Sequence, residues 1–593
     1  MKPVIFILGS SALPLAQRLK AELNGEIHGP DTYSKATPHL AGLFKSGRTI
    51  IGICASGILI RALAPHLDDK HNEPPVLAVA EDGSSVIPLL GGHHGANSLA
   101  RRIAALTKGH AAITTASEVT LGFALDDVLP GYTLANPEDV KSVTAALLAG
   151  SSLSIVCHPG ESRDPEPPFH CENVKHLQLH PWVPASAGMI IEITEANRMG
   201  GPTHLIYHPH TLAVGVGCER GTSREEVATL IKNTLKENNL AVQSIAGYAS
   251  IDIKEDEPAI SSLYNVNFFS AEELNAFAPK LKTPSGYVMA EVGTPGVAEA
   301  AALAAAGPDA ELIVPKTKSK RATVAIARAP LPLIEMHGRQ MGTLAVIGIG
   351  PGSNMMRSPD ANLELNLATD WVGYDLYLDL IADIKTDQIE HRFPLGGEEA
   401  RVRHAIALAK QGKQVALVCS GDAGIYAMAA LVYEIIDFEP TRIKVEVIPG
   451  ISAFQAAAAK AGAMIGHDFC CISLSDLLTP WEAIEKRVKA AADGDFVISF
   501  YNPRSLKRRN QLERAFAILK DHRPPDTPVI IASNLGRAGE KVTIVKFADF
   551  NPDDVDMLTL VMVGSSQSKS VRRGDGKTYA YTPRGYAKKR ETL

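Results

Sequence analysis

The chain has 593 residues, 45% of them hydrophobic and 21% charged, which is the composition of a globular protein too long for one hydrophobic core. Its formal net charge of −6 and its 7 scattered cysteines give no reason to expect a nucleic-acid partner, a disulfide framework or a bound metal. Because no apolar run approaches the roughly 18 residues of a membrane helix and no signal peptide is evident, we expect a cytoplasmic protein without a membrane partner.

The first 150 residues predict an α/β domain. Val4–Leu8 and Thr49–Cys54 are apolar runs of strand length, each followed by small residues and an amphipathic stretch. Two further strands, Val76–Ala80 and Val86–Leu89, precede a polar glycine-rich loop at Leu90–Asn97.

Residues 157–189 differ in composition from the rest of the chain. They are rich in Pro, His and Gly and show no hydrophobic periodicity, so they predict a segment of low order rather than part of a core. Their histidines and cysteines match no metal-site spacing. We therefore interpret 151–205 as a linker region that contains this insert.

Residues 206–330 predict a second α/β domain. Ser223 and Glu226 have the spacing of a capping box at the start of a helix. The alanine-rich run Val297–Ala306 predicts a helix that packs closely on a flat surface. The following segment, 331–341, contains proline and predicts an extended, stiff linker.

Three glycine loops at strand ends dominate the carboxyl part. The strand Leu344–Ile347 runs into Gly-Ile-Gly-Pro-Gly at 348–352, and two later strands run into the loops 420–424 and 449–453. The first loop fails as a dinucleotide fingerprint because Ser353 occupies the third glycine position. Three such loops predict one ligand crevice at the carboxyl edge of a sheet.

These loops, Ser-Gly-Asp-Ala-Gly-Ile-Tyr (420–426), Val-Ile-Pro-Gly-Ile-Ser-Ala (447–453) and the block Ile472–Trp481, resemble the tetrapyrrole methylases, and precorrin-3B C17-methyltransferases in particular. The resemblance spans about 342–566 and implies a two-subdomain methylase fold over 342–567, followed by a basic tail at 568–593. It implies S-adenosylmethionine (SAM) as cofactor and a tetrapyrrole substrate, and it leaves open a homodimer through this domain. One departure is Ala423, where many relatives carry proline.

The resemblance also places the cofactor. It implies that backbone groups and small residues of the loops hold SAM, while the Asp422 carboxylate either contacts the ligand or braces its own loop. The expected cofactor-binding residues are Gly348, Gly350, Pro351, Gly352, Ser420, Gly421, Asp422, Ile425, Ser452, Ala453, Asn502 and Gly536.

Methyl transfer asks the protein mainly to hold two reactants in line. The family's reaction also contracts the macrocycle, which implies that a substrate hydroxyl loses a proton to a base. Candidates are His467, Asp468 and Asp476, with a structural role for His467 as the alternative. Because the substrate carries many carboxylates, we expect Arg504 and Arg508 to bind it.

The amino half resembles the cobalt-precorrin-5A hydrolases, which open a ring lactone and release acetaldehyde. Ile60–Pro65, Leu90–Asn97, Ile113–Ala116 and the region 212–328 carry the resemblance. Lys254, Glu257 and Glu299 lie on its signature strings, with structural ion pairs as the alternative reading.

We therefore expect an α/β multidomain protein that methylates C17 of precorrin-3B behind a hydrolase-like region. The alternative is a methylase of another precorrin whose amino half only binds and delivers a corrinoid. A dinucleotide-dependent oxidoreductase is a more distant rival.

Overall fold

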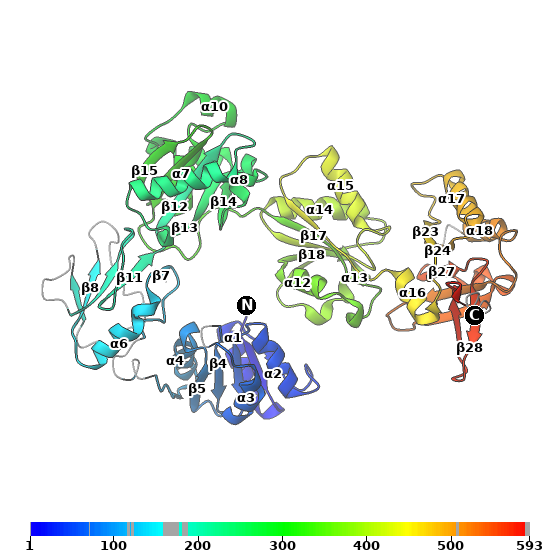
Figure 1. Ribbon diagram of the computed structural model, residues 1–593, viewed down its shortest axis with the longest axis horizontal. Coiled ribbons are helices and arrows are strands. Elements are labelled where there is room, and N and C mark those ends of the chain that lie inside the picture. Colours follow the sequence, from blue (N-terminus) through cyan, green and yellow to red (C-terminus); the bar gives the residue numbers. More distant parts are fainter. Residues whose placement is uncertain are drawn as a thin grey trace. The chain divides into compact units, whose positions relative to one another are not determined.

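The computed structural model describes residues 2–69, 72–115, 119, 124–157, 177–180, 188–505 and 509–586. The chain divides into two compact units, Met1–Gly338 and Arg339–Leu593, and both are built from open β-sheets with helices packed on them (Figure 1). Within the described residues, no helix has the length and apolarity to cross a membrane. The unit boundary falls inside the predicted linker 331–341, but Met336 of that segment is buried in the core of the amino unit.

The first sheet is the α/β domain predicted at the amino terminus, although it ends earlier than residue 150. Its strand order is β2-β1-β3-β4-β5-β6, and all neighbours are parallel except β4 and β5. The strands are β1 (Val4–Ile7), β2 (Glu26–His28), β3 (Ile50–Ile53), β4 (Val76–Val79), β5 (Ser85–Leu90) and β6 (His110–Ala111), and the helices are α1 (Leu13–Leu23), α2 (Ala36–Lys45), α3 (Ser56–Leu63) and α4 (Ala96–Thr107).

A second sheet lies where the sequence predicted a linker. Its order is β7-β11-β10-β8-β9, and α6 packs on it through Val143 and Leu147. The elements are β7 (Tyr132–Leu134), α6 (Val140–Leu148), β8 (Leu153–Cys157), β9 (Leu177–His180), β10 (Met189–Ile193) and β11 (His204–Pro209).

The linker prediction over 151–205 is therefore wrong for the strands on either side of the insert. β8 and β10 pair in parallel, with Leu153 opposite Met189 and Cys157 opposite Ile193. Between them in the chain lies β9, which pairs in parallel with β8, with Leu153 opposite Leu177, so the predicted insert also contains a strand of the sheet. Residues 158–176 and 181–187, most of the predicted insert, lie outside the described residues.

The third sheet corresponds to the predicted second α/β domain and has the order β14-β13-β12-β16-β15. The alanine-rich helix α11 begins and ends as predicted, and it lies so close to β12 that a Cβ on Gly215 would be 1.9 Å from the Ala298 carbonyl oxygen. The elements are β12 (Leu212–Cys218), α7 (Arg224–Glu237), β13 (Ile245–Ile251), α8 (Pro258–Ser261), β14 (Val266–Phe269), α9 (Ala271–Asn275), α10 (Gly286–Val292), α11 (Val297–Ala306), β15 (Glu311–Lys318) and β16 (Ala322–Arg328).

The carboxyl unit opens with an all-parallel sheet of order β19-β18-β20-β17-β21. Because the three glycine loops follow β17, β20 and β21, which are neighbours, their positions at one sheet edge follow from this order. The elements are β17 (Thr343–Gly348), α12 (Pro359–Leu367), β18 (Asp370–Tyr374), α13 (Asp375–Asp379), β19 (Ile389–Phe393), α14 (Glu398–Lys410), β20 (Gln414–Cys419), α15 (Met428–Phe438) and β21 (Lys444–Ile448).

A mixed sheet of order β23-β24-β27-β25-β26 forms the second subdomain, so the carboxyl unit has the two subdomains that were expected. The elements are α16 (Ala453–Ala461), β23 (Phe469–Ser473), α17 (Trp481–Asp493), β24 (Val497–Tyr501), α18 (Gln511–Leu519), β25 (Pro528–Ser533), β26 (Lys541–Lys546) and β27 (Thr559–Val563).

The predicted basic tail differs from expectation in its first half. β28 (Lys569–Arg572) and β29 (Thr578–Tyr581) form a hairpin, and β29 pairs in parallel with the short strand β22 (Gly462–Ala463). Ala580 is fully buried in the core around α16. A strand of four residues with one inward apolar side chain is too short to stand out among basic neighbours, which explains the error.

Candidate functional site

The three glycine loops meet, as the sequence predicted. Gly350 donates its N–H to the Gly421 carbonyl at 3.1 Å, and Gly421 donates to the Gly350 carbonyl at 2.7 Å. The third loop joins them at Gly450, where an added Cβ would lie 2.1 Å from the Gly421 oxygen. The three strand ends therefore join into one glycine-lined floor at one edge of the sheet.

The glycines of this floor serve two purposes. A Cβ on Gly348 would be 2.7 Å from the Gly421 carbonyl oxygen, so Gly348 and Gly450 are required where loop packs on loop. Gly421 differs because its φ is +70° while the nearest atom to an added Cβ is the Ala453 nitrogen, 3.9 Å away. Its conformation favours glycine, but a Cβ there would make only ordinary van der Waals contacts with Ala453 and Ser452.

Asp422 braces two of the loops. Its Oδ1 accepts from the Gly424 N–H at 2.8 Å and its Oδ2 from the Gly450 N–H at 3.0 Å. Of the two roles left open by the sequence, the geometry favours the structural one, because each carboxylate oxygen is already engaged by a loop N–H.

Helix α16 begins beside Gly421. Ser452 caps it in a capping box with Gln455 and is buried, whereas Ala453 is half-buried. The Phe454 N–H donates to the Tyr501 hydroxyl at 3.3 Å. The helix start adds partial positive charge to a wall made of small side chains.

Arg537 ties the second subdomain to the loops of the first, and sequence reasoning missed it. Its Nε donates to the Pro351 carbonyl at 2.9 Å, and its Nη2 donates to the Ser420 hydroxyl at 2.8 Å. A Cβ on Gly352, which has φ of +148°, would lie 2.4 Å from the Arg537 Cγ. Gly352 is therefore required by this arginine; the signal available in the sequence was its place directly after Gly536.

Glu540 holds the loop that contains Gly536 and Arg537. Its Oε2 accepts from the Gly536 N–H at 2.6 Å, and its Oε1 accepts from Lys460 of α16 at 2.6 Å.

Burial lowers the pKa of the Arg537 guanidinium from its usual value. Such a partly desolvated arginine depends on the acceptors that it has, Pro351 and Ser420.

Two tyrosines form a second bridge between the subdomains. The Tyr426 hydroxyl donates to the Cys471 carbonyl at 2.8 Å, and its ring lies 5.2 Å from that of Tyr501. Tyr426 has φ of +52°, a left-handed conformation that is strained for an aromatic residue and concentrates at functional sites. Burial raises the pKa of both phenols, so both keep their protons at neutral pH.

Asn502 and Ile425 border the same region. Asn502 follows Tyr501, has φ of +47° and donates its side-chain amide to the Ser473 hydroxyl at 3.2 Å. Ile425 packs against the buried cluster that includes Phe454 of α16. The structure thus gathers the predicted cofactor residues around the facing edges of the two subdomains.

The predicted bases lie in two places. His467 and Asp468 form an exposed pair, with Nδ1 and Oδ2 3.4 Å apart. Asp476 instead accepts from the Gln511 side chain at 2.7 Å.

Of the predicted substrate arginines, Arg504 donates to the Pro552 carbonyl at 2.6 Å and to Asp553 at 2.7 Å. Arg508 lies outside the described residues.

In the amino unit, Glu299 has a structural role. It is 1% exposed and accepts from the backbone N–H groups of Lys282, Thr283 and Lys316 at 2.8 to 3.1 Å, and from the Thr283 hydroxyl at 2.8 Å. Burial opposes ionisation, but these hydrogen bonds prevail and hold the pKa of Glu299 below its usual value.

The other two signature residues of the amino unit, Lys254 and Glu257, follow β13 in the chain. Glu257 is buried, and both its oxygens accept from the Gly221 N–H at 3.2 Å. Lys254 ends the short helical turn Asp252–Lys254. Glu257 therefore braces the loop that follows β12, and its ion pair with Arg220 at 3.8 Å agrees with the structural alternative.

Comparison with known proteins matches three family models. The tetrapyrrole (corrin/porphyrin) methylase model matches residues 343–551, the cobalamin synthesis G amino-terminal model matches 38–118, and the corresponding carboxyl-terminal model matches 212–327. Both resemblances inferred from the sequence are confirmed.

A Salmonella typhimurium protein named probable cobalt-factor III C(17)-methyltransferase is 45% identical over 243 residues, which cover 99% of that protein and 41% of this chain. The chain belongs to the tetrapyrrole methylases. A precorrin-3B C(17)-methyltransferase from Sinorhizobium sp is 39% identical over 98% of its length.

A third relative, the cobalamin biosynthesis protein CobIJ of Mycobacterium bovis, is 43% identical over 251 residues. The present tetrapyrrole methylase spans about half of that relative's length, 48%. All three relatives match over 41–42% of the chain, which is the share of the carboxyl unit.

Proposed function

We propose that the carboxyl unit transfers a methyl group from SAM to C17 of precorrin-3B, or of its cobalt-containing counterpart, with contraction of the ring. The observation that carries this proposal is the 45% identity over nearly the whole length of a relative named for C17 methylation. The family assignment alone would support only methylation of some tetrapyrrole.

The junction of the three loops supports SAM as the cofactor. Gly421, the small side chain of Ala453 and the partly exposed backbone of the loops 420–424 and 449–453 offer space and hydrogen-bonding groups for a nucleoside without demanding charge. We propose the predicted set from Gly348 to Gly536 as the holding residues, with Asp422 and Arg537 keeping the loops in place.

When bound, SAM supplies a methyl group on a sulfonium that is already a good leaving group. The task of this chain is to hold the acceptor ring carbon in line with it, which lowers the barrier by roughly 7–11 kcal/mol in well-oriented cases. Tyr501, whose hydroxyl accepts from the Phe454 N–H and keeps its own hydrogen to donate, suits the binding of a macrocycle oxygen at the subdomain junction.

Ring contraction requires a group that takes the hydroxyl proton. We propose His467, Asp468 and Asp476 as the candidates for this role. His467 and Asp468 form an exposed ion pair, and Asp476 follows the end of β23, where it accepts from Gln511. Arg504 and Arg508 stay proposed contacts of the substrate carboxylates, with Arg504 exchanging Asp553 for a carboxylate of the substrate.

For the amino unit we propose a hydrolase-like role in the same pathway, because two cobalamin synthesis G models match it. The alternative is a unit that binds and delivers a corrinoid to a methylase of another precorrin. A homodimer through the carboxyl unit is a further proposal, tested by sedimentation.

The experiment uses the full chain with SAM and, in parallel, each early precorrin. The expected result is a mass gain of one methyl group on precorrin-3B and a change in the absorption spectrum as the ring contracts, with calorimetric binding of S-adenosylhomocysteine. Binding of NAD without any response to S-adenosylhomocysteine would overturn the assignment, and methylation of a different precorrin would move it within the family.

A further inference from the structure

The carboxyl-terminal hairpin carries a hollow that the proposed function does not use. The strand register places Val571 opposite Tyr579, Lys569 opposite Tyr581, and Tyr581 opposite Ala463. Because side chains alternate along a strand, these residues share one face, while Ser570 and the buried Ala580 share the other. The face with the tyrosines is thus the outer one.

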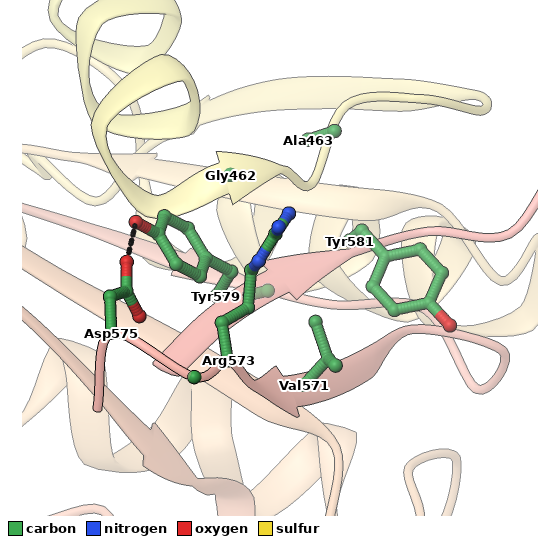
Figure 2. Close-up of a pocket in the computed structure, with 9 residues that line it drawn as sticks. Gly462, Ala463, Val571, Arg573, Asp575, Tyr579 and Tyr581 are labelled. Carbon is green, nitrogen blue, oxygen red and sulfur yellow. Dashed lines mark hydrogen bonds between the residues drawn. The ribbon is translucent and has the colours of Figure 1, made fainter. Parts of the chain in front are cut away.

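This outer face is concave. A hollow of about 550 Å³ is lined by Val571, Arg573, Tyr579 and Tyr581 of the hairpin and by Gly462 and Ala463 of β22, a size within the range of small-molecule sites, about 300–1,000 Å³. Figure 2 shows the Arg573 side chain extending from the hairpin toward β22, with Tyr579 on one side and Tyr581 on the other.

The hairpin is also strongly basic in a chain whose net charge is −6. Between 569 and 581 it carries four cations, Lys569, Arg572, Arg573 and Lys577, and one carboxylate, Asp575. Asp575 is engaged by the Tyr579 hydroxyl at 3.1 Å and by the Lys577 N–H at 2.9 Å. Among the residues that the structure describes, the Arg573 guanidinium has no hydrogen-bonding or ionic partner.

We propose that this face, named here the hairpin platform and defined by Val571, Arg573, Tyr579 and Tyr581, binds a flat macrocycle that carries peripheral carboxylates. Tyrosine rings and Val571 offer a surface for the apolar ring, and Arg573 offers a guanidinium for a carboxylate at its rim. The choice of occupant rests on the proposed function, since it is the class of molecule that the carboxyl unit would methylate.

The platform is distinct from the methyl-transfer crevice. Helix α16 begins at Ala453, next to Gly421, and ends at Ala461, directly before β22. Nine residues of helix span roughly 13 Å, so the two places lie at opposite ends of α16. The hairpin also lies beyond residue 551, where the match to the methylase family model ends. The platform is thus a holding site for substrate or product.

The test titrates the full chain with uroporphyrin III, an octacarboxylate macrocycle, and follows porphyrin fluorescence at several salt concentrations. The variant Arg573→Glu reverses the charge on the platform. Its matched control is Arg572→Glu, the same change on the neighbouring residue, which pairs with Thr578 and alternates to the opposite face. Both positions are exposed, so both variants are expected to fold.

We expect Arg573→Glu to weaken one class of uroporphyrin sites at least tenfold, Arg572→Glu to change it less than twofold, and added salt to mimic the first variant. Tyr579→Ala should weaken the same class. Calorimetric binding of S-adenosylhomocysteine should be unchanged in every variant, and its absence in the wild type would refute the proposed function separately.

Equal uroporphyrin binding by wild type and Arg573→Glu, or none by the wild type, would overturn the platform. So would a change of oligomeric state in sedimentation that accompanies Arg573→Glu, since the face would then be an interface between copies of this chain.

Discussion

Two stretches of parallel sheet, one in each unit, differ in whether the sequence predicted them: the one in the carboxyl unit was predicted, and the one in the amino unit was missed. At β17, β20 and β21 the loops are short and every strand end is marked by glycine. At β8 and β10 the strands are also parallel neighbours, but 31 residues of aperiodic sequence separate them. The comparison teaches that a parallel sheet is recognisable from its connections more than from its strands, because the connections carry the turn chemistry.

The largest expected effect comes from deleting 158–188, the residues between β8 and β10, which include the edge strand β9. With 158–188 deleted, Cys157 would join Met189 directly, although these residues lie at opposite ends of paired strands. A parallel connection needs a dozen or more residues. We therefore expect the second sheet to fail and the amino unit to become insoluble or protease-sensitive, measured by limited proteolysis and thermal melting.

Its control keeps β9 and replaces 158–176 and 181–187 with the same number of Gly/Ser residues. This variant should restore a protease-resistant amino unit while S-adenosylhomocysteine binding by the carboxyl unit stays unchanged throughout. A stable protein from the plain deletion would show that β8 and β10 do not pair as parallel neighbours, and that the segment is a true linker.

The next effect separates the two kinds of glycine in the loop floor. A Cβ at Gly450 meets the Gly421 oxygen at 2.1 Å, whereas one at Gly421 meets no atom closer than 3.9 Å. We expect Gly450→Ala to destabilise the carboxyl unit by about 3 kcal/mol through overpacking, with loss of ligand binding. Gly421→Ala should cost only about 1–2 kcal/mol of backbone strain.

Gly421→Leu completes this test, since its side chain would enter the space proposed for the cofactor. It should abolish S-adenosylhomocysteine binding while melting close to Gly421→Ala. If Gly421→Leu bound the ligand with wild-type affinity, the space beside Gly421 would not be the cofactor space.

A smaller effect is expected at Arg537, the bridge to Pro351 and Ser420. Arg537→Ala leaves two acceptors without their donor and should weaken S-adenosylhomocysteine binding about tenfold, near 1.4 kcal/mol. Arg537→Lys should restore part of it, because one ammonium reaches one acceptor but not both. The matched control is Arg403→Ala, an exposed arginine of α14 in the same unit, which should leave the affinity unchanged; equal losses in both variants would contradict the bridge.

The predictable part of the fold follows from these cases. Local conformation or close packing permits few residue types at some positions, and these positions can be predicted from the sequence. Examples are the glycine loops, the capping residue Ser223 and the alanine-rich helix α11. The roles of Gly352 and Arg537 depend on residues 185 positions apart in the chain, and no local pattern encodes that contact. The hairpin β28–β29 was missed because its strands are four residues long, lie among basic residues and place only Ala580 in a core.

The smallest effect concerns two buried carboxylates, Glu299 in the amino unit and Asp370 in the carboxyl unit, each 1% exposed. Asp370 accepts from Lys413 at 2.9 Å and from His391 at 2.8 Å; burial alone would raise its pKa, but these bonds and that of Thr369 lower it. Glu299, whose pKa is also lowered, has mainly backbone donors.

A lowered folded-state pKa means that the stabilisation is present above the unfolded-state pKa, about 3.9 for Asp, and is lost as pH falls through the folded value. Asp370→Asn should therefore lower the melting temperature of the carboxyl unit at pH 7, and its difference in melting temperature from wild type should narrow as pH falls from 5 to 3.

The melting transition of the carboxyl unit is identified because S-adenosylhomocysteine raises its midpoint temperature. Glu299→Gln should show the same narrowing in the amino transition. Added salt should shrink the difference from wild type only for Asp370→Asn, since the Lys413 ammonium pairs with Asp370 whereas Glu299 is held mainly by backbone N–H groups. Parallel pH curves for wild type and Asp370→Asn would mean that Asp370 does not gain its charge stabilisation from Lys413 and His391.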